Sequence, residues 1–301
     1  QPARIPPLWR PWAETGVLAC GLTAILLTGG IDLSIGSAVS LCSAVMGVLV
    51  ASLDLPWPLV AALTVACGGL AGALNGILVV LGIGSLVATL ATMALFAGLA
   101  LAISQGERVT GLPPNLTRLG QGDWLGLPNQ LWLLLIVALG LSVLVHGTRS
   151  GRWLFAVGDN RQAARFAAVP VARLEWSLYA LSGLLAGVVA VSQTARVGAA
   201  VPNLGQGLEL QAIACVVLGG TRVTGGFGSI GRTVLGLAVL AHLEIGLRLL
   251  GSRKWTPPGF SSSLVLNSNL RLIVIGVLLV LVALVNERVA GAAAGRSRST
   301  S

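Results

Sequence analysis

The stretch that decides the fold is GGIDLSIGS, residues 29–37, which interrupts an apolar run from Trp12 to Leu53. As a single helix that run would measure about 63 Å, because each helical residue adds about 1.5 Å. The hydrocarbon core of a bilayer is only about 30 Å thick. We therefore predict two membrane-spanning helices with a break at GGIDLS, and Asp32 lies in that break.

The composition indicates that lipid surrounds most of the chain. Of 301 residues, 55% are hydrophobic and 10% are charged, and the mean hydropathy is +0.89. An ordinary soluble domain carries roughly 25% charged residues. The sequence thus predicts an all-α, polytopic transmembrane helical bundle of about nine to ten spans. The candidate spans are the runs 12–28, 35–53, 58–80, 84–104, 131–146, 176–195, 208–220, 231–250 and 270–286.

The arginines indicate how the bundle is oriented. Residues 147–175 form a loop that carries five of them: Arg149, Arg152, Arg161, Arg165 and Arg173. Cytoplasmic loops hold an excess of Lys and Arg, so we expect this loop to face the cytoplasm. Counting spans from it places GGIDLS on the same side and the N-terminus on the other. We expect 1–11 to be an N-terminal extramembrane segment, 12–286 a transmembrane domain and 287–301 a cytoplasmic tail.

Several function classes lack the residues that they need. The net charge of +9 is spread over loops and tails without a basic run interleaved with aromatic residues, which argues against nucleic-acid binding. Lys254 is the only lysine and follows Arg253, so no GxxxxGKS or GxxxxGKT phosphate loop exists and the chain does not hydrolyse ATP by itself. His146 and His242 are too far apart for HExxH, and no GxSxG elbow is present. The cysteines stand singly, without metal-site spacing. We predict no catalytic residue, cofactor or metal, which leaves transport or scaffolding.

Small residues predict close packing between helices. Gly68, Gly72 and Gly76 recur at four-residue spacing, and Gly183 with Gly187 repeats the pattern. Such spacing lets helix backbones approach closely in lipid. Asn75, on the first of these helices, either lines a polar path or bonds a neighbouring helix.

The arginine-bearing loop contains a short helix of its own. Asp159 is a candidate N-cap and Gln162 the matching capping-box residue, and Pro170 ends the run from 160 to 169. Pairs of alanines at i, i+4 give this helix a smooth face: Ala163 with Ala167, and Ala164 with Ala168. Its shape suits the groove of another protein, and the alternative is a solvated or interfacial helix with no partner.

Five stretches, taken in order, resemble the permeases of bacterial sugar ABC importers. They are GGIDLSIGS, GALNGILVV at 72–80, AVGDNRQAARFAAVPV at 156–171, YALSGLLAGVVAV at 179–191 and GQGLELQAIACVVLGGTRVTGGFGSIGRTVLG at 205–236. The likeness covers about residues 16–250 and points to the ribose, xylose, galactose and autoinducer branch. It implies one more helix before residue 12, and 251–270 looks longer than the usual connection.

The resemblance implies a multi-pass permease of the bacterial inner membrane, working as a homo- or heterodimer by alternating access. A separate cytoplasmic ABC ATPase would dock on it, and a periplasmic sugar-binding protein would deliver the solute. The segment that matches the family's ATPase-coupling helix contains Gly158, Asp159, Asn160, Ala163, Ala164, Arg165 and Ala168. Its ending, FAAVPV, departs from the small-glycine ending usual in the family.

A second group of polar residues is a candidate for gating or for the translocation path: Asp32, Ser34, Asn75, Glu209 and Gln211. The break is placed so that Asp32 can reach a membrane face, where Asp32 or Ser34 caps the following helix. The alternative for Asp32 is gating or inter-helix coupling, since charge near lipid is costly. Glu209 and Gln211 either face a polar path or stabilise the start of a helix.

The rival class is a stand-alone secondary transporter or channel for a small polar solute. It predicts paired ionisable groups at mid-membrane, inverted repeats and half-helices with facing breaks. The sequence offers only a faint echo of such a repeat, between GGIDLSIGS and GGFGSIGR. A membrane enzyme has no recognisable catalytic set here.

Overall fold

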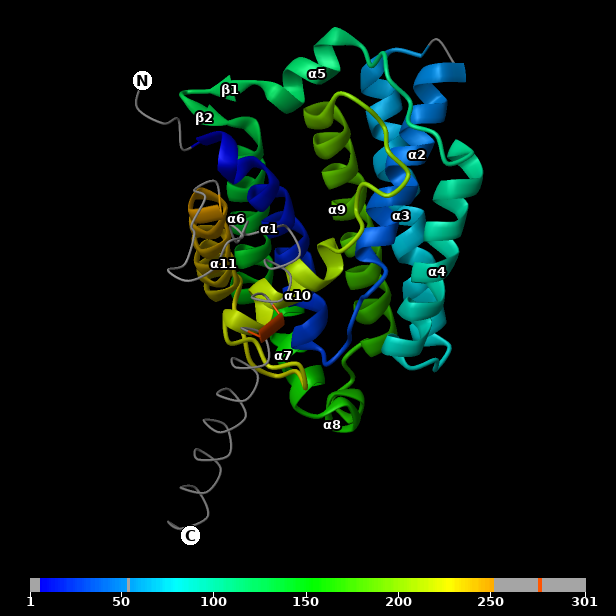
Figure 1. Cartoon of the computed structure of the whole chain (residues 1–301). Coiled ribbons are helices and arrows are strands. Elements are labelled where there is room, and N and C mark those ends of the chain that lie inside the picture. The colour runs from blue at the N-terminus through cyan, green and yellow to red at the C-terminus, as the bar shows by residue number, and fades with distance from the viewer. Residues whose placement is uncertain (1–5, 53–54, 252–275, 278–301) are drawn as a thin grey trace, which may run out of the picture.

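The structure is a computed structural model, and it describes residues 6–52, 55–251 and 276–277. Helices dominate this part of the chain, with one two-stranded hairpin (Figure 1). The elements are α1 (Pro6–Leu27), α2 (Ile35–Ser52), α3 (Trp57–Val80), α4 (Ser85–Ser104), α5 (Pro114–Gln121), β1 (Asp123–Trp124), β2 (Leu127–Pro128), α6 (Asn129–Gly147), α7 (Arg149–Asp159), α8 (Arg161–Phe166), α9 (Val171–Val197), α10 (Leu208–Leu218) and α11 (Ile230–Gly251).

The predicted all-α membrane architecture is confirmed, whereas the span count is not. Among the described residues, five helices are long and apolar enough to cross a membrane: α2, α3, α4, α6 and α9. The predicted runs at 12–28, 208–220 and 231–250 also form helices, and α1 already begins at Pro6. However, α10 has only 11 residues. The predicted span 270–286 and the segment 251–270 lie almost wholly outside the described residues.

The chain breaks where GGIDLS predicts. Helix α1 ends at Leu27 and α2 begins at Ile35. In Figure 1 the extended segment between them climbs from the lower end of the bundle to its middle, where α2 starts. The segment between α9 and α10 does the reverse, descending from the upper end to the middle. Two discontinuous helices thus begin inside the protein.

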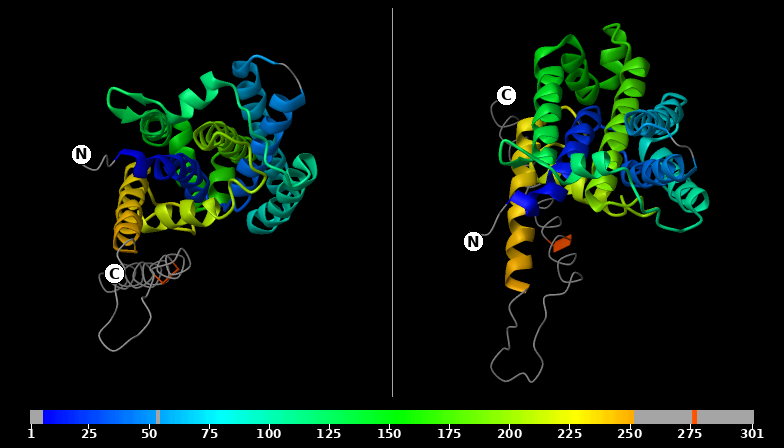
Figure 2. Two further views of the ribbon diagram at one scale, coloured as in Figure 1. Left: turned by 45° about the horizontal axis from the view of Figure 1, so that its top comes forward. Right: turned by 90° about the horizontal axis from the view of Figure 1, so that it is seen from above.

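The glycine motif forms the predicted close contact, between α3 and α9. A Cβ atom at Gly68 or Gly72 would overlap backbone atoms of Gly183 on α9. One at Gly76 would be pressed against Trp176. Figure 2 shows α9 near the centre of the molecule, with α2, α3 and α4 on one side and α1, α6 and α11 on the other. The backbone contact ties α9 to the first of these groups.

The two ends of the bundle differ. At the hairpin end, which holds α5, β1 and β2, Arg10 donates to the carbonyls of Gly120 and Gln121 and pairs with Asp123 at 2.6 Å. At the opposite end, which holds α7 and α8, the chain turns back into α9 (Figure 1); we call it the coupling end after the role predicted for its short helix. Helix α1 runs from the hairpin end to the coupling end, so GGIDLS and the arginine loop share an end, as predicted.

Candidate functional site

The segment that resembles a coupling helix folds as two short helices, α7 and α8, rather than one. Asn160 caps α8, because its side-chain oxygen accepts from the N–H groups of Gln162 and Ala163 at 3.0 Å each. The prediction that Asp159 is the cap was wrong, since Asp159 is the last residue of α7. The helix also ends at Phe166 rather than Val169.

The end of α8 explains the FAAVPV sequence. Ala168 has φ of 58°, in the left-handed region. The N–H of Val169 donates to the carbonyl of Ala164 at 3.0 Å, and that of Ala168 to the carbonyl of Arg165 at 3.1 Å. These two bonds make a Schellman ending, whose left-handed residue is usually glycine. The helix thus ends in the geometry that a glycine usually provides, with a strained alanine in that place.

Exposure divides the predicted coupling residues. Asp159, Asn160, Ala163, Arg165 and Ala168 are exposed, and Gly158 is half-buried. Ala164 is only 4% exposed, so the predicted smooth face of Ala164 with Ala168 does not exist. The sequence reasoning missed Phe166, a residue that is 92% exposed. A lone large aromatic residue in a short helix of alanines and arginines was the signal that could have found it.

Glycines join α7 to two other parts of the coupling end. A Cβ atom at Gly158 would overlap the carbonyl oxygen of Leu27 and the N–H of Gly226. The N–H of Gly226 donates to that same carbonyl at 3.0 Å. Gly29, after α1, lies against the carbonyl of Thr224. The coupling segment is therefore in backbone contact with the end of α1 and with the loop between α10 and α11.

Asp32 holds three helices together at the break. One carboxylate oxygen accepts from the N–H and the hydroxyl of Ser34 at 3.0 and 2.7 Å, and the other accepts from Ser182 on α9 at 3.0 Å. Asn75 on α3 donates to the Ser34 hydroxyl at 2.7 Å. Asp32 is 2% exposed. The prediction that Asp32 reaches a membrane face was wrong, because the residue is buried inside the bundle. The prediction that Asp32 caps α2 was also wrong, because its carboxylate oxygens accept from Ser182 on α9 and from Ser34, the residue before α2.

Side chains also satisfy the backbone of the break. The N–H of Ile31 donates to the Ser85 hydroxyl at 3.2 Å, and its carbonyl accepts from Tyr179 at 3.3 Å. Asn75 lies on the helix interface rather than on an open path, and its side-chain oxygen is buried without a partner among the described residues. Of the two interpretations left open for Asn75, the bond to a neighbouring segment is the one observed.

Glu209 and Gln211 lie on different sides of α10 and do not share a site. Glu209 accepts from the N–H of Gly207 at 3.2 Å and lines a cavity of about 290 Å³. Gln211 lines a separate cavity of about 190 Å³, together with Gln193 and Arg196. Neither side chain is hydrogen-bonded to Asp32, Ser34 or Asn75, whose side-chain partners are each other and Ser182. The five candidates for the path thus fall into three places.

The cavity beside Glu209 forms where the two discontinuous helices begin. The backbones of Gly36 and Gly205 are in contact there, and the N–H of Gly205 donates to the Ser40 hydroxyl at 3.0 Å. The cavity is bounded by α2, α4 and the segment before α10. Its lining consists of Ser37, Ser40, Met93, Ala97, Leu101, Pro202, Asn203, Gln206 and Glu209.

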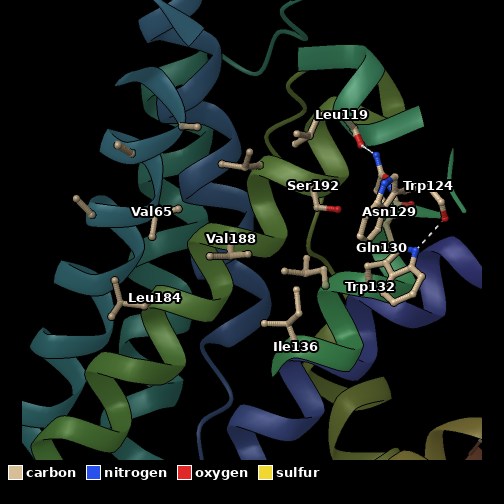
Figure 3. A pocket seen from close by; sticks show the side chains of 15 residues that line it. Val65, Leu119, Trp124, Asn129, Gln130, Trp132, Ile136, Leu184, Val188 and Ser192 are labelled. Carbon is tan, nitrogen blue, oxygen red and sulfur yellow. Dashed lines mark hydrogen bonds between the residues drawn. The ribbon is translucent and has the colours of Figure 1, made fainter. Parts of the chain in front are cut away.

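A second kind of cavity has a different character. It measures about 850 Å³ between α3, α6 and α9, and its walls are mostly aliphatic and aromatic (Figure 3). Polar groups at one end are already bonded: Asn129 donates to the carbonyl of Leu119 at 2.8 Å, and Trp132 to that of Trp124 at 3.0 Å. This cavity therefore offers little to a polar solute. Nor do the described residues gather three His, Cys, Asp or Glu side chains that could hold a metal ion.

Comparison with known proteins gives the family. Residues 13–283 match the family model described as branched-chain amino acid transport system / permease component. The chain is 38% identical over 256 residues to the autoinducer 2 import system permease protein LsrD of Yersinia enterocolitica, covering 83% of this chain and 76% of that protein. It is 39% identical to the ribose import permease protein RbsC of Bacillus subtilis, covering 83% and 79%.

The corresponding ribose permease of Escherichia coli K12 is 38% identical over 240 residues, which cover 78% of this chain and 74% of that protein. No solved structure matches. The family model spans nearly the whole chain, and the relatives match over more than two thirds of both lengths. The chain therefore belongs to this family of transport-system permease components and is a multi-pass protein of the inner membrane.

Proposed function

We propose that the chain is the permease subunit of an ATP-driven ABC importer for a sugar or sugar-like solute. Relatives that import ribose and autoinducer 2 support the solute class. The observation that carries the proposal is the coupling end, where α8 projects an exposed Phe166 while Gly158 contacts the end of α1 and the loop between α10 and α11. A separate ATPase drives alternating access, and the permease itself carries no ATPase site.

The exposed side of α8 is the docking surface for the ATPase in this proposal. Phe166, Ala163 and Ala167 give it an apolar patch, and Arg165 adds a charge. Aromatic residues, phenylalanine among them, are enriched at protein interfaces relative to the rest of the surface. Movement of α8 would pass through Gly158 to the carbonyl end of α1 and to the loop holding Gly226. In this way ATPase motion reaches the segments that precede α2 and follow α10.

The remaining partners follow from the same assignment. The loop 147–175 faces the cytoplasm, and a periplasmic sugar-binding protein docks at the hairpin end. A second permease copy or a paralogue completes a homo- or heterodimer, and lipid surrounds the transmembrane domain at 12–286. Residues 1–11 and 287–301 are extramembrane segments in this scheme. Nucleic acid has no part in it.

One observation favours a second candidate, a stand-alone secondary transporter or channel. Discontinuous helices that begin inside the bundle are typical of secondary transporters, and α2 and α10 both begin in this way (Figure 1). The alternative predicts solute movement without any ATPase. Coupling through α8 would then have no purpose.

A purification followed by reconstitution separates the two functions. The tagged chain would be extracted in mild detergent with native lipid, and its co-purifying proteins and ATPase activity would be measured. The importer predicts a stoichiometric ATPase and ATP-dependent uptake of ribose into proteoliposomes that contain the binding protein. Uptake without ATPase or ATP would establish the secondary transporter and overturn the importer.

A further inference from the structure

We infer that the 290 Å³ cavity beside Glu209 is a hydrated chamber that accepts neutral polyhydroxylated solutes and disfavours anions, with Glu209 as the residue that sets this charge preference. The identity of the solute rests on the proposed function as a sugar importer. The hydration and the charge preference rest on the geometry of the cavity alone, so they are testable without transport.

The first step concerns the backbone around the cavity. Non-helical backbone at membrane depth is tolerated only where protein buries it or where it lines a water-filled space. The segment between α9 and α10 is such a backbone, and its Gly205 is in contact with Gly36 in the first turn of α2. The segment before α10 contributes Asn203 and Gln206 to the cavity, and both side chains are exposed. Water in the cavity thus accounts for irregular chain at this depth.

The second step concerns the chemistry of the lining. The Ser37 hydroxyl donates to the carbonyl of Ser34 at 2.8 Å, so its lone pairs remain to accept. Ser40 accepts from the N–H of Gly205, so its own proton remains to be donated. The side-chain amides of Asn203 and Gln206 offer both donors and acceptors. A lining that offers both donors and acceptors matches the hydroxyl groups of a polyol, and Met93 and Ala97, which also line the cavity, match its carbon face.

The third step concerns charge. Among the described residues that line the cavity, Glu209 is acidic and none is basic. Its carboxylate lies in the first turn of α10 and accepts from the N–H of Gly207, a position that suits a negative charge. The carboxylate also adjoins Gly36 at the start of α2, where no side chain intervenes. A phosphorylated or carboxylated solute would meet this charge, whereas a neutral polyol would use the carboxylate as a hydrogen-bond acceptor.

Thiol accessibility tests the inference directly. In a background in which the four native cysteines are alanine, Asn203→Cys and Gln206→Cys would be reconstituted and treated with cationic trimethylammonium and anionic sulfonate methanethiosulfonates. Rates would be normalised to a free thiol. We expect both positions to react, with the cationic reagent faster by at least about fivefold, the effect of one unit charge at contact distance in water. Glu209→Gln should remove that preference.

Two reporter positions serve as controls. Ile136→Cys, which is 67% exposed on a wall of the apolar cavity, should react with neither reagent. Leu125, which is 75% exposed on the hairpin, serves as the second position. For Leu125→Cys, the ratio of the cationic to the anionic reaction rate should be the same with and without Glu209→Gln. Each variant would first be shown to elute as a monodisperse peak.

The outcomes are separable from those of the proposed function. Unreactive thiols at both cavity positions would overturn the hydration, and a cation preference that survives Glu209→Gln would overturn the role of Glu209. Slower modification in the presence of ribose supports the polyol assignment, and equal slowing by ribose 5-phosphate overturns the exclusion of anions. If the charge preference is observed but no ATP-driven uptake is, the importer fails while the chamber stands.

Discussion

Gly36, in the first turn of α2, and Gly205, shortly before α10, lie with their backbones in direct contact. A Cβ atom on either residue would overlap the carbonyl oxygen of the other. This contact brings together the starts of two helices that are far apart in the sequence. It also holds the Glu209 carboxylate against α2, since a Cβ atom at Gly36 would overlap that group as well.

The first prediction follows from this contact. Gly36→Ala should destabilise the detergent-solubilised protein, because overpacking costs about 1–3 kcal/mol. A loss of that size should lower the thermal midpoint by at least about 2 °C. Gly98→Ala is the matched control, since a Cβ atom there would meet no atom of another element within 4 Å and alanine favours the helix. Equal midpoints for the two variants, measured by loss of the monodisperse peak on heating, would show that the contact is not close.

Part of this arrangement was predictable from sequence, and the reasons are physical. The break at GGIDLS follows from helix length against bilayer thickness, and the α3–α9 seam follows from the spacing of Gly68, Gly72 and Gly76. Both arguments are local. The contact of Gly36 with Gly205 joins distant segments through glycines that have no distinguishing pattern. Periodicity alone could not place it.

The coupling segment shows where local rules give more than one answer. Asp159 and Asn160 are adjacent and both suit an N-cap, so the sequence does not choose between them. The six residues of α8 are too few to establish a buried face, which is why Ala164 was expected at the surface. By contrast, the separation of Glu209 from Gln211 was predictable, because residues two apart on a helix point in nearly opposite directions.

The second prediction concerns the end of α8. Ala168→Gly should stabilise the turn by about 0.5–1 kcal/mol, because glycine adopts the left-handed region without the cost that a Cβ atom carries. Hydrogen exchange at the amide of Val169, which bonds to Ala164, would report the change as slower exchange. Ala167→Gly is the control, since Ala167 has φ of −79° and gains nothing. Faster exchange in Ala168→Gly would contradict the strain argument.

The third prediction tests the docking surface. Phe166→Asp should reduce the ATPase that co-purifies with the chain by at least about tenfold, because hot-spot aromatic residues contribute about 2 kcal/mol or more to an interface. Phe166→Leu should retain most of it. Leu125→Asp places the same charge on a side chain that is 75% exposed at the hairpin end, and it should leave the ATPase content unchanged. Full ATPase recovery with Phe166→Asp would exclude the ring as an anchor.

The last prediction separates a structural from a coupling role for Asp32. Asp32→Ala removes the acceptor for Ser34 and Ser182 together, and buried donors left unpaired cost about 1–3 kcal/mol each. We expect that variant to lose its monodisperse peak. Asp32→Asn keeps one acceptor oxygen for Ser34 and offers an amide to Ser182, so it should fold. If Asp32 couples α9 to the break, Asp32→Asn will hydrolyse ATP at the normal rate in the reconstituted complex but import severalfold less ribose for each ATP. A normal ratio of ribose to ATP would confine Asp32 to holding α2, α3 and α9 together.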